Sequence, residues 1–338
     1  MKQHNSQRGF SLIELLVALA IGSFLIIGAV TMQANTRKTF TVNEQQARLQ
    51  ETARYVLSVL EPEFQLAGRF GYTNRPEDIR FPAVNALASQ MRQGSSAIAG
   101  LPAALTSCGN NFAIDVIQTV QAANNSYGLT CAALGGGHNG FSDTITIRRS
   151  GDADVAPTNT KFQMQTSRIA QFDQRLFVNG VLPGITSVGD VQVRDMIVES
   201  YYVANNADNR PGVPALRIKQ LVAGPALDDQ EVIRGVEDIQ VEFGVDPGVD
   251  LDLNGIADDV NGATSRYVPP NNAIVTSGQV VAVRLWVRVR AEEQEPGFVN
   301  NRSYTYAGVT YTPPANDHFR RVLMSRTIFL RNARVWTD

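Results

Sequence analysis

The first long apolar run of the chain extends from Phe10 to Val30 and contains one charged residue, Glu14. As a helix, these 21 residues measure about 31 Å, which matches a hydrocarbon core about 30 Å thick. A carboxylate within that core costs about 2.5–3.5 kcal/mol on insertion scales, so Glu14 needs a partner. The pattern therefore predicts a membrane-spanning helix with a functional carboxylate near its start.

Beyond the membrane segment, apolar residues continue at helical spacing among polar ones. This stripe consists of Val42, Leu49, Ala53, Val56 and Leu60. The spacing predicts an amphipathic helix whose apolar side packs on a folded domain. Pro62 lacks the backbone N–H that a helix interior requires, so we expect it to end or kink the helix near Glu61. The predicted stem runs from Phe10 to about Leu66.

The remainder of the chain predicts a β-rich head. From Gly68 to Thr130 small and turn-forming residues dominate, so we expect loops with a few short elements. Strand-like runs bounded by turn residues follow at 143–149, 196–204, 215–222, 236–245, 280–290 and 322–331. Their order predicts an antiparallel sheet packed on the stem helix, an α+β fold. The expected parts are a leader at 1–9, a stem helix at 10–67 and a head at 68–338.

The segment before the apolar run differs from that of a secretory signal. Lys2 and Arg8 make it basic, and its small residue, Gly9, precedes the apolar core instead of following it. Cleavage after Gly9 would remove only the leader and leave the helix in the product. The new N-terminus would be Phe10, and we expect its amine to pair with Glu14 of a neighbouring subunit.

The residues from Arg8 to Gly22, RGFSLIELLVALAIG, closely resemble the prepilin signature of type IV pilins and type II secretion pseudopilins. The resemblance implies cleavage after Gly9 by a prepilin peptidase, N-methylation of Phe10, and a role for Glu14 in filament assembly. The alternative is an ordinary signal anchor that happens to contain a glutamate.

Several segments beyond the signature resemble PilW-type minor pilins. They are Gln50–Tyr55, Leu66–Gly68 and Phe70–Gly71 at the end of the stem, and Tyr201–Ala204, Pro214–Leu216, Gly235–Val241 and Val281–Arg284 in the head. The resemblance implies a structural protein that helps to initiate or cap a type IV pilus. It also implies an inner-membrane anchor with a periplasmic head before assembly, then a place in the surface pilus, with other minor pilins and the major pilin as partners. A type II secretion minor pseudopilin is the closest alternative.

Charge and motifs narrow the remaining function classes. The formal net charge of −2 gives no indication of nucleic-acid binding. One strand, however, places Arg284, Trp286, Arg288 and Arg290 on a single face, which would suit a DNA-binding or adhesive module at a filament tip. The alternative is a solvated face or one that pairs with acidic residues of a neighbour. No catalytic motif stands out, so we predict neither an enzyme nor a small-molecule substrate.

The two cysteines, Cys108 and Cys131, predict a disulfide because the head would fold in an oxidising periplasm. Two separate buried thiols are the alternative. A glycine pattern follows at Gly135, Gly137 and Gly140, but the next residues resemble a strand, so we expect a flexible loop there and no dinucleotide site.

An acidic segment carries the clearest ligand chemistry. Oxygen ligands alternate along it at Asp250, Asp252, Asn254 and Asp258, with a backbone carbonyl at Ile256. This arrangement predicts a calcium loop, because calcium binds six to eight oxygen atoms. The alternative is a solvated acidic turn, since Asp and Asn also favour turn geometry.

Overall fold

The computed structural model describes residues 11–73, 75–93, 95–169, 173–184, 190–246, 248, 264–277 and 279–333. The chain divides into two compact units, one ending at Arg48 and the other comprising Leu49–Asp338. The first unit is helical in its described part. The second, which we call the head unit, begins within the stem helix.

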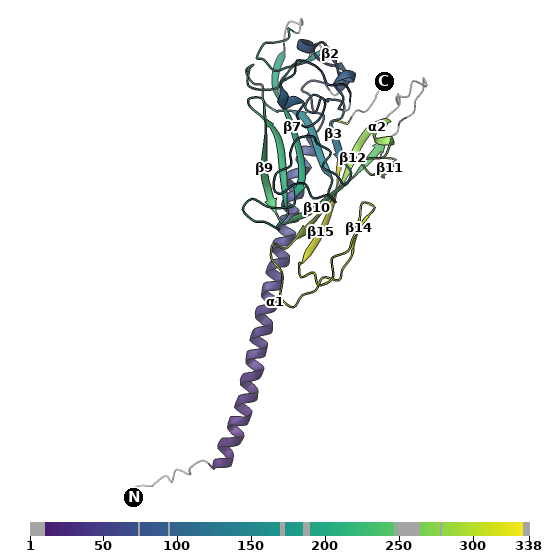
Figure 1. The fold of residues 1–338 in the computed structure, drawn as a ribbon. Helices are drawn as coiled ribbons and strands as arrows, with labels where there is room; N and C mark the ends of the chain where they lie inside the picture. Colours follow the sequence, from purple (N-terminus) through teal and green to yellow (C-terminus); the bar gives the residue numbers. More distant parts are fainter. Residues whose placement is uncertain are drawn as a thin grey trace. The chain divides into compact units, whose positions relative to one another are not determined.

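The stem helix α1 runs from Leu12 to Leu66, close to the predicted span (Figure 1). Ser11 precedes it as the N-cap: its hydroxyl oxygen accepts the N–H of Ile13 at 3.3 Å. In the first unit the large apolar side chains remain exposed, including Leu12 at 81% and Phe24 at 77%. Such a surface suits a lipid environment or a bundle of similar helices.

Of the two outcomes expected at Pro62, an end of the helix near Glu61 is wrong, because α1 continues four residues past Pro62. The helix ends where Gly68 adopts a left-handed conformation, with φ of 75°. Asn332 then donates its side-chain N–H groups to the carbonyls of Gln65 and Ala67, each at 3.2 Å. A residue near the other end of the sequence therefore satisfies carbonyls that the helix end leaves unpaired.

The elements after α1 are mostly strands. The helical ones are short: η1 (Pro76–Asp78), η2 (Pro82–Val84), η3 (Ala88–Met91), η4 (Ala103–Leu105) and α2 (Ile274–Ser277). The strands before residue 200 are β1 (Ile79–Phe81), β2 (Ala86–Leu87), β3 (Val120–Ala123), β4 (Thr144–Ser150), β5 (Gln163–Ser167), β6 (Gln174–Phe177) and β7 (Val191–Ala204). The later ones are β8 (Ala215–Val222), β9 (Ala226–Arg234), β10 (Val236–Asp246), β11 (Arg266–Val268), β12 (Gln279–Arg290), β13 (Tyr304–Tyr306), β14 (Val309–Tyr311) and β15 (Arg321–Phe329).

The larger sheet contains nine strands in the path β2-β1-β6-β5-β7-β4-β3, with β8 paired to β7 and β9 paired to β8. The smaller sheet has the order β11-β10-β12-β15. Pairing is antiparallel in both except between β1 and β6, which are parallel, so the expected single antiparallel sheet becomes two mainly antiparallel ones. The hairpin β13–β14 forms a third, two-stranded sheet.

Hydrogen bonds join the two main sheets just before β4. The N–H of Asp143 donates to the carbonyl of Ile239 on β10 at 2.8 Å. The Asp143 carboxylate in turn accepts the N–H of Val241 at 2.8 Å and that of Asn125 at 2.7 Å. Because this carboxylate is buried, its pKa is raised to about 7, despite the two N–H donors that lower it.

The main core of the head unit forms between the end of α1 and both sheets. Leu49, Ala53, Val56 and Leu60, four residues of the predicted stripe, are buried in it together with strand residues of β4, β10 and β12. Full burial of an aliphatic side chain of this size contributes about 1.5–3 kcal/mol. The stripe therefore fixes this part of the helix to the head. Val42 lies in the first unit and is only partly buried.

A second core cluster lies beneath the loop-rich segment from Gly68 to Thr130, where the expectation of loops with short elements is confirmed. Arg148 of β4 is fully buried there. Its guanidinium donates to the carbonyls of Phe112 and Gln118 at 2.8 and 2.7 Å, and to the side-chain oxygens of Gln93 and Gln121. The Arg148 guanidinium therefore holds together parts of the loop-rich segment that form few regular backbone hydrogen bonds.

Candidate functional site

The start of α1 is the first candidate site, and Glu14 is its described member. The Glu14 carboxylate accepts the backbone N–H of Ser11 at 3.2 Å, and the Ser11 hydroxyl accepts the N–H of Ile13. This reciprocal arrangement resembles a capping box, with the Ile13 N–H in place of that of Glu14, and satisfies N–H groups that a helix start leaves unpaired. Glu14 therefore has a partner in its own chain, which the sequence prediction did not foresee. Gly9 and Phe10 lie outside the described residues.

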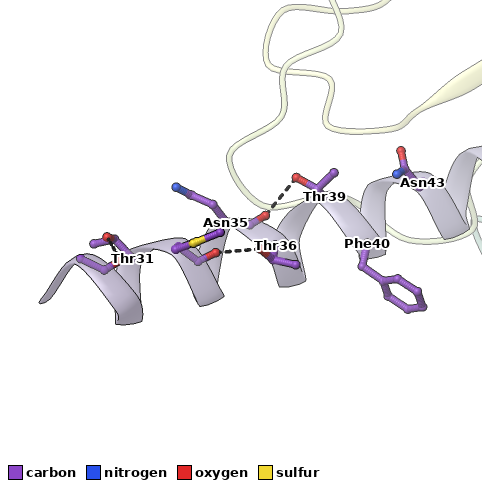
Figure 2. A pocket seen from close by; sticks show the side chains of 8 residues that line it. Thr31, Asn35, Thr36, Thr39, Phe40 and Asn43 are labelled. Carbon is purple, nitrogen blue, oxygen red and sulfur yellow. Dashed lines mark hydrogen bonds between the residues drawn. The ribbon is translucent and has the colours of Figure 1, made fainter. Parts of the chain in front are cut away.

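Within the described residues, α1 is the one helix long and apolar enough to cross a membrane. Farther along, threonine hydroxyls donate to backbone carbonyls of the preceding turn: Thr31 to Gly28, Thr36 to Met32 and Thr39 to Asn35, at 2.9–3.0 Å (Figure 2). The hollow at this level is lined by side chains of this one helix. Since one helix provides no converging walls, we assign it no ligand.

The disulfide between Cys108 and Cys131 is present, with the two Cα atoms 4.4 Å apart. It fastens the second core cluster to the loop that carries Gly135 and Gly137. That loop is hydrogen-bonded to the two residues directly after β7. The N–H of Asn206 donates to the Gly135 carbonyl at 2.7 Å, and the N–H of Asn205 donates to the Gly137 carbonyl at 3.0 Å. The glycine pattern thus belongs to a hydrogen-bonded loop followed by β4, which is not the helix that a dinucleotide site requires.

A charged cluster holds the same loop against the larger sheet. Asp229 of β9 pairs with Arg217 and Lys219 of β8, each at 2.8 Å, and accepts the hydroxyl of Tyr202 at 2.8 Å. Lys219 also donates to the carbonyl of Ala132, next to the disulfide. Burial alone would raise the pKa of Asp229, but the bonds from Lys219 and Arg217 lower it overall. The charges in this cluster are paired with one another, and the cluster holds the loop in place.

The arginine face of β12 is partly covered by the protein itself. Arg288 is 3% exposed, pairs with Glu237 at 3.0 Å, and lies 3.7 Å from the ring centre of Tyr311 on β14. Arg290 lies 4.2 Å from the ring centre of Phe319. The interpretations of a solvated face or of pairing with a neighbour's acids are therefore wrong for these two residues. Nucleic acid cannot reach Arg288 in this fold.

The other half of this face remains open to solvent in part. Arg284 lies 3.8 Å from the ring centre of Tyr267 on β11 and 5.8 Å from that of Trp286. It also pairs with Glu242 of β10 at 3.5 Å. The charge of Arg284 is thus balanced within the sheet, which leaves little attraction for a polyanion.

A buried ionic network under the β13–β14 hairpin was not foreseen from the sequence. Arg321 of β15 binds both carboxylate oxygens of Glu237, at 2.6 and 3.0 Å, and both of Asp317, at 2.8 and 2.9 Å. Burial alone would raise the pKa of Glu237, but Arg321, Arg288 and Arg290 lower it overall. Asp238 beside it has a raised pKa because its burial outweighs Arg288 and the Tyr306 hydroxyl.

The five predicted calcium ligands lie outside the described residues; they are Asp250, Asp252, Asn254, Ile256 and Asp258. At the edge of that segment, Asp246 accepts the N–H of Gly248 at 3.0 Å in a local turn. Within the part of the chain that the structure describes, no group of three or more His, Cys, Asp or Glu residues is arranged to hold a metal ion.

Two family models match the chain. The prokaryotic N-terminal methylation motif matches residues 4–30, and the model of the type IV pilus-assembly protein W, PilW, matches residues 200–332. The second match runs from the end of β7 to just beyond β15 and therefore contains the whole smaller sheet. Together, the two matches support a PilW-like type IV pilin. Its α+β fold, with one long N-terminal helix and a β-rich head, is the one predicted.

Two other comparisons add little to these family matches. No curated protein sequence matches it. Among solved structures, a type IV-like pilin from Thermus thermophilus is similar at 15% identity, covering 57% of this chain and 80% of the other. The TM-score of that match is 0.25.

The features that sequence reasoning missed in this chain are mostly contacts between distant segments. The ionic network joins β10, β12 and β15 to the segment after β14, and the cap of α1 comes from Asn332. The local contacts between Ser11 and Glu14 are the exception, because the sequence Ser11-Leu12-Ile13-Glu14 has the serine-to-glutamate spacing of a capping box and could have indicated them.

Proposed function

We propose that this PilW-like pilin is a minor component of the type IV pilus that helps to initiate assembly and lies at the tip. The proposal rests on two observations taken together: a methylation motif matches residues 4–30, and the large apolar side chains of the first part of α1 are exposed. Such a helix requires either lipid or other helices as its surroundings. The mechanism is lateral packing of α1 against equivalent helices, together with contacts between heads.

Glu14 has a defined part in this mechanism. In the single chain its carboxylate accepts one N–H, that of Ser11, and an ionised carboxylate has capacity for further donors. After cleavage, the charged N-terminal amine of Phe10 in a neighbouring subunit would donate a further hydrogen bond to the Glu14 carboxylate. Pairing of the two charges removes much of the cost of holding them within the membrane or the filament core.

The size of the head supports a place at the tip and a low copy number. For a compact domain as long as Leu49–Asp338, the usual scaling gives a radius of gyration of about 19 Å. Packed helices lie only about 8–10 Å apart. Heads of this size would crowd one another at every position, whereas a terminal subunit has no subunit beyond it that competes for space.

Deletion of the gene tests this proposal. We expect fewer surface pili, with the major subunit still made and processed, and restoration by the full chain supplied in trans. Unchanged pilus numbers would contradict an initiating role. If pili are normal while secretion through a type II system fails, the pilus assignment is overturned and the pseudopilin alternative takes its place.

We also propose that the Asp250–Asp258 segment binds calcium. The support is the donor set itself, since carboxylate and amide oxygens at alternate positions suit a hard cation. A calcium ion there would join the ends of β10 and β11, the two strands that flank the segment, and would stabilise the smaller sheet.

A further inference from the structure

The strand β15 forms one border of the smaller sheet. Its pairing with β12 is regular, with nine consecutive residue pairs from Ala282–Phe329 to Arg290–Arg321 and no bulge. Among the residues that the structure describes, no strand pairs with its other border. A row of backbone N–H and C=O groups is therefore available along a straight edge.

The middle of this edge is open on both sides. Ser325, Arg326 and Thr327 are all exposed, although consecutive strand residues point to opposite faces of a sheet. Phe329, at the end of the strand, is 66% exposed. The border of the sheet is therefore accessible over this stretch, where Arg326 contacts Glu61 of α1 but keeps half of its side chain exposed.

Natural sheets usually protect their edges with proline, a bulge, charges or covering segments. In the same sheet, the opposite border has such protection, because β11 is three residues long and Ser142 and Asp143 bond to β10. The edge strand β9 of the larger sheet carries Asp228 and Glu231. In contrast, β15 contains no proline, glycine or acidic residue, and Arg326 is its one exposed charge.

We propose that β15 is a docking edge for an extended segment of a different pilus subunit, which adds a strand beside it. This inference rests on the proposed function, because it requires other pilins next to the head. Backbone hydrogen bonds would supply affinity, and the side chains of alternate residues would supply specificity.

Charge identifies the kind of partner. The strand carries Arg321 and Arg326 and no acidic residue. If β15 of a second copy paired antiparallel with it about the strand centre, Arg326 of one copy would lie opposite or diagonal to Arg326 of the other, and the two like charges would repel each other. A segment with an acidic residue at that position is favoured instead. Arg326 uses one amino group on Glu61 at 3.1 Å, and a guanidinium has five N–H donors in all. The partner should also present an apolar residue to Phe329.

Site-specific photo-crosslinking in piliated cells tests this proposal with the full chain. Benzoylphenylalanine replaces Thr327 in one strain and Gln230, which is exposed on the β9 edge, in a control strain. We expect the Thr327 variant to form an adduct with another protein that carries a prepilin motif, mapped by mass spectrometry to an extended segment containing an acidic residue. The Gln230 variant should form no such adduct.

Charge variants add a second measurement. Arg326→Glu should lower the yield of the Thr327 adduct about fivefold, since a cross-strand charge pair is worth up to about 1 kcal/mol, and Arg326→Lys should restore it. An equal yield from all three chains would overturn the charge argument.

Recovery of the chain in sheared pili separates the two proposals. If the chain is present in pili but Thr327 gives no adduct, or an adduct with a second copy alone, the docking edge is wrong while the pilin function stands. If the chain is absent from pili and no adduct forms, both proposals fail.

Discussion

Removal of Arg321 is the most informative single perturbation of the head. The side chain is 1% exposed and binds two carboxylates, those of Glu237 and Asp317, through four hydrogen bonds. Arg321→Met retains much of the length and packing but leaves both carboxylates without their main cation. Breaking a buried ion pair in this way costs about 3–5 kcal/mol, because uncompensated charge remains buried.

The same strand offers a matched control. Arg326 pairs with Glu61 at 3.1 Å, but its side chain is 50% exposed, and exposed ion pairs contribute about 0–1 kcal/mol. Urea unfolding of the full chain in detergent, followed by the fluorescence of Trp286 on β12, measures both variants. We expect Arg321→Met to lose about 3–5 kcal/mol and Arg326→Met less than about 1 kcal/mol. Equal losses would show that the network contributes no more than a surface pair.

The pH dependence gives the network a second signature. In the native chain the pKa of Glu237 is lowered below its ordinary value of 4.5, so this group contributes stability above pH 4.5 that is lost as the pH falls through the folded-state pKa. In Arg321→Met the main cation is gone, and the pKa of Glu237 should rise. The loss of stability should then be larger at pH 8 than at pH 5. A pH-independent loss would refute this electrostatic account.

Four further outcomes are expected. The pKa of Asp143 is raised from 3.8 to about 7, so the free energy of unfolding should fall as the pH rises between these values, and Asp143→Asn should remove that slope; a retained slope would assign it to another group. Thiol labelling of the denatured, unreduced chain should find neither Cys108 nor Cys131 free, and replacing both with serine should cost about 3.5 kcal/mol in the chain-entropy estimate, measured by urea unfolding. Glu14→Ala should insert into the membrane at least as well as the native chain but enter pili poorly, as quantified by immunoblots of sheared pili; normal entry would show that the carboxylate is dispensable. Calcium should raise the melting temperature, and Asp252→Ala should abolish that rise; identical melts with calcium and with a chelator would leave only an acidic turn.

The sequence predicted the long helix and the strands of the PilW-matching region well, because their patterns are strong. Apolar residues recur in register along β10 and β12, and all six predicted runs contain a strand. The missed strands lack that signal. In β5 the buried residues include Gln163, Gln165 and Ser167, and β9 contains consecutive acids at Asp228 and Asp229.

The covered arginine face shows why part of the site was beyond sequence reasoning. Alternation along β12 placed Arg288 and Arg290 correctly on one face, but the pattern does not reveal what lies above it. The covering residues Tyr311 and Phe319 come from a segment between β12 and β15 with no periodic signal. Pro62 was misjudged for a related reason: packing of Phe64 in the core and the bonds from Asn332 hold the last turn of the helix in place.

Mass spectrometry of the chain recovered from sheared pili tests the central claim most directly, because one sample reports both processing and copy number. The account predicts a mature N-terminus at methylated Phe10, without Met1–Gly9, and an amount far below that of the major subunit. A retained leader, or near-stoichiometric amounts of this chain along the filament, would contradict it.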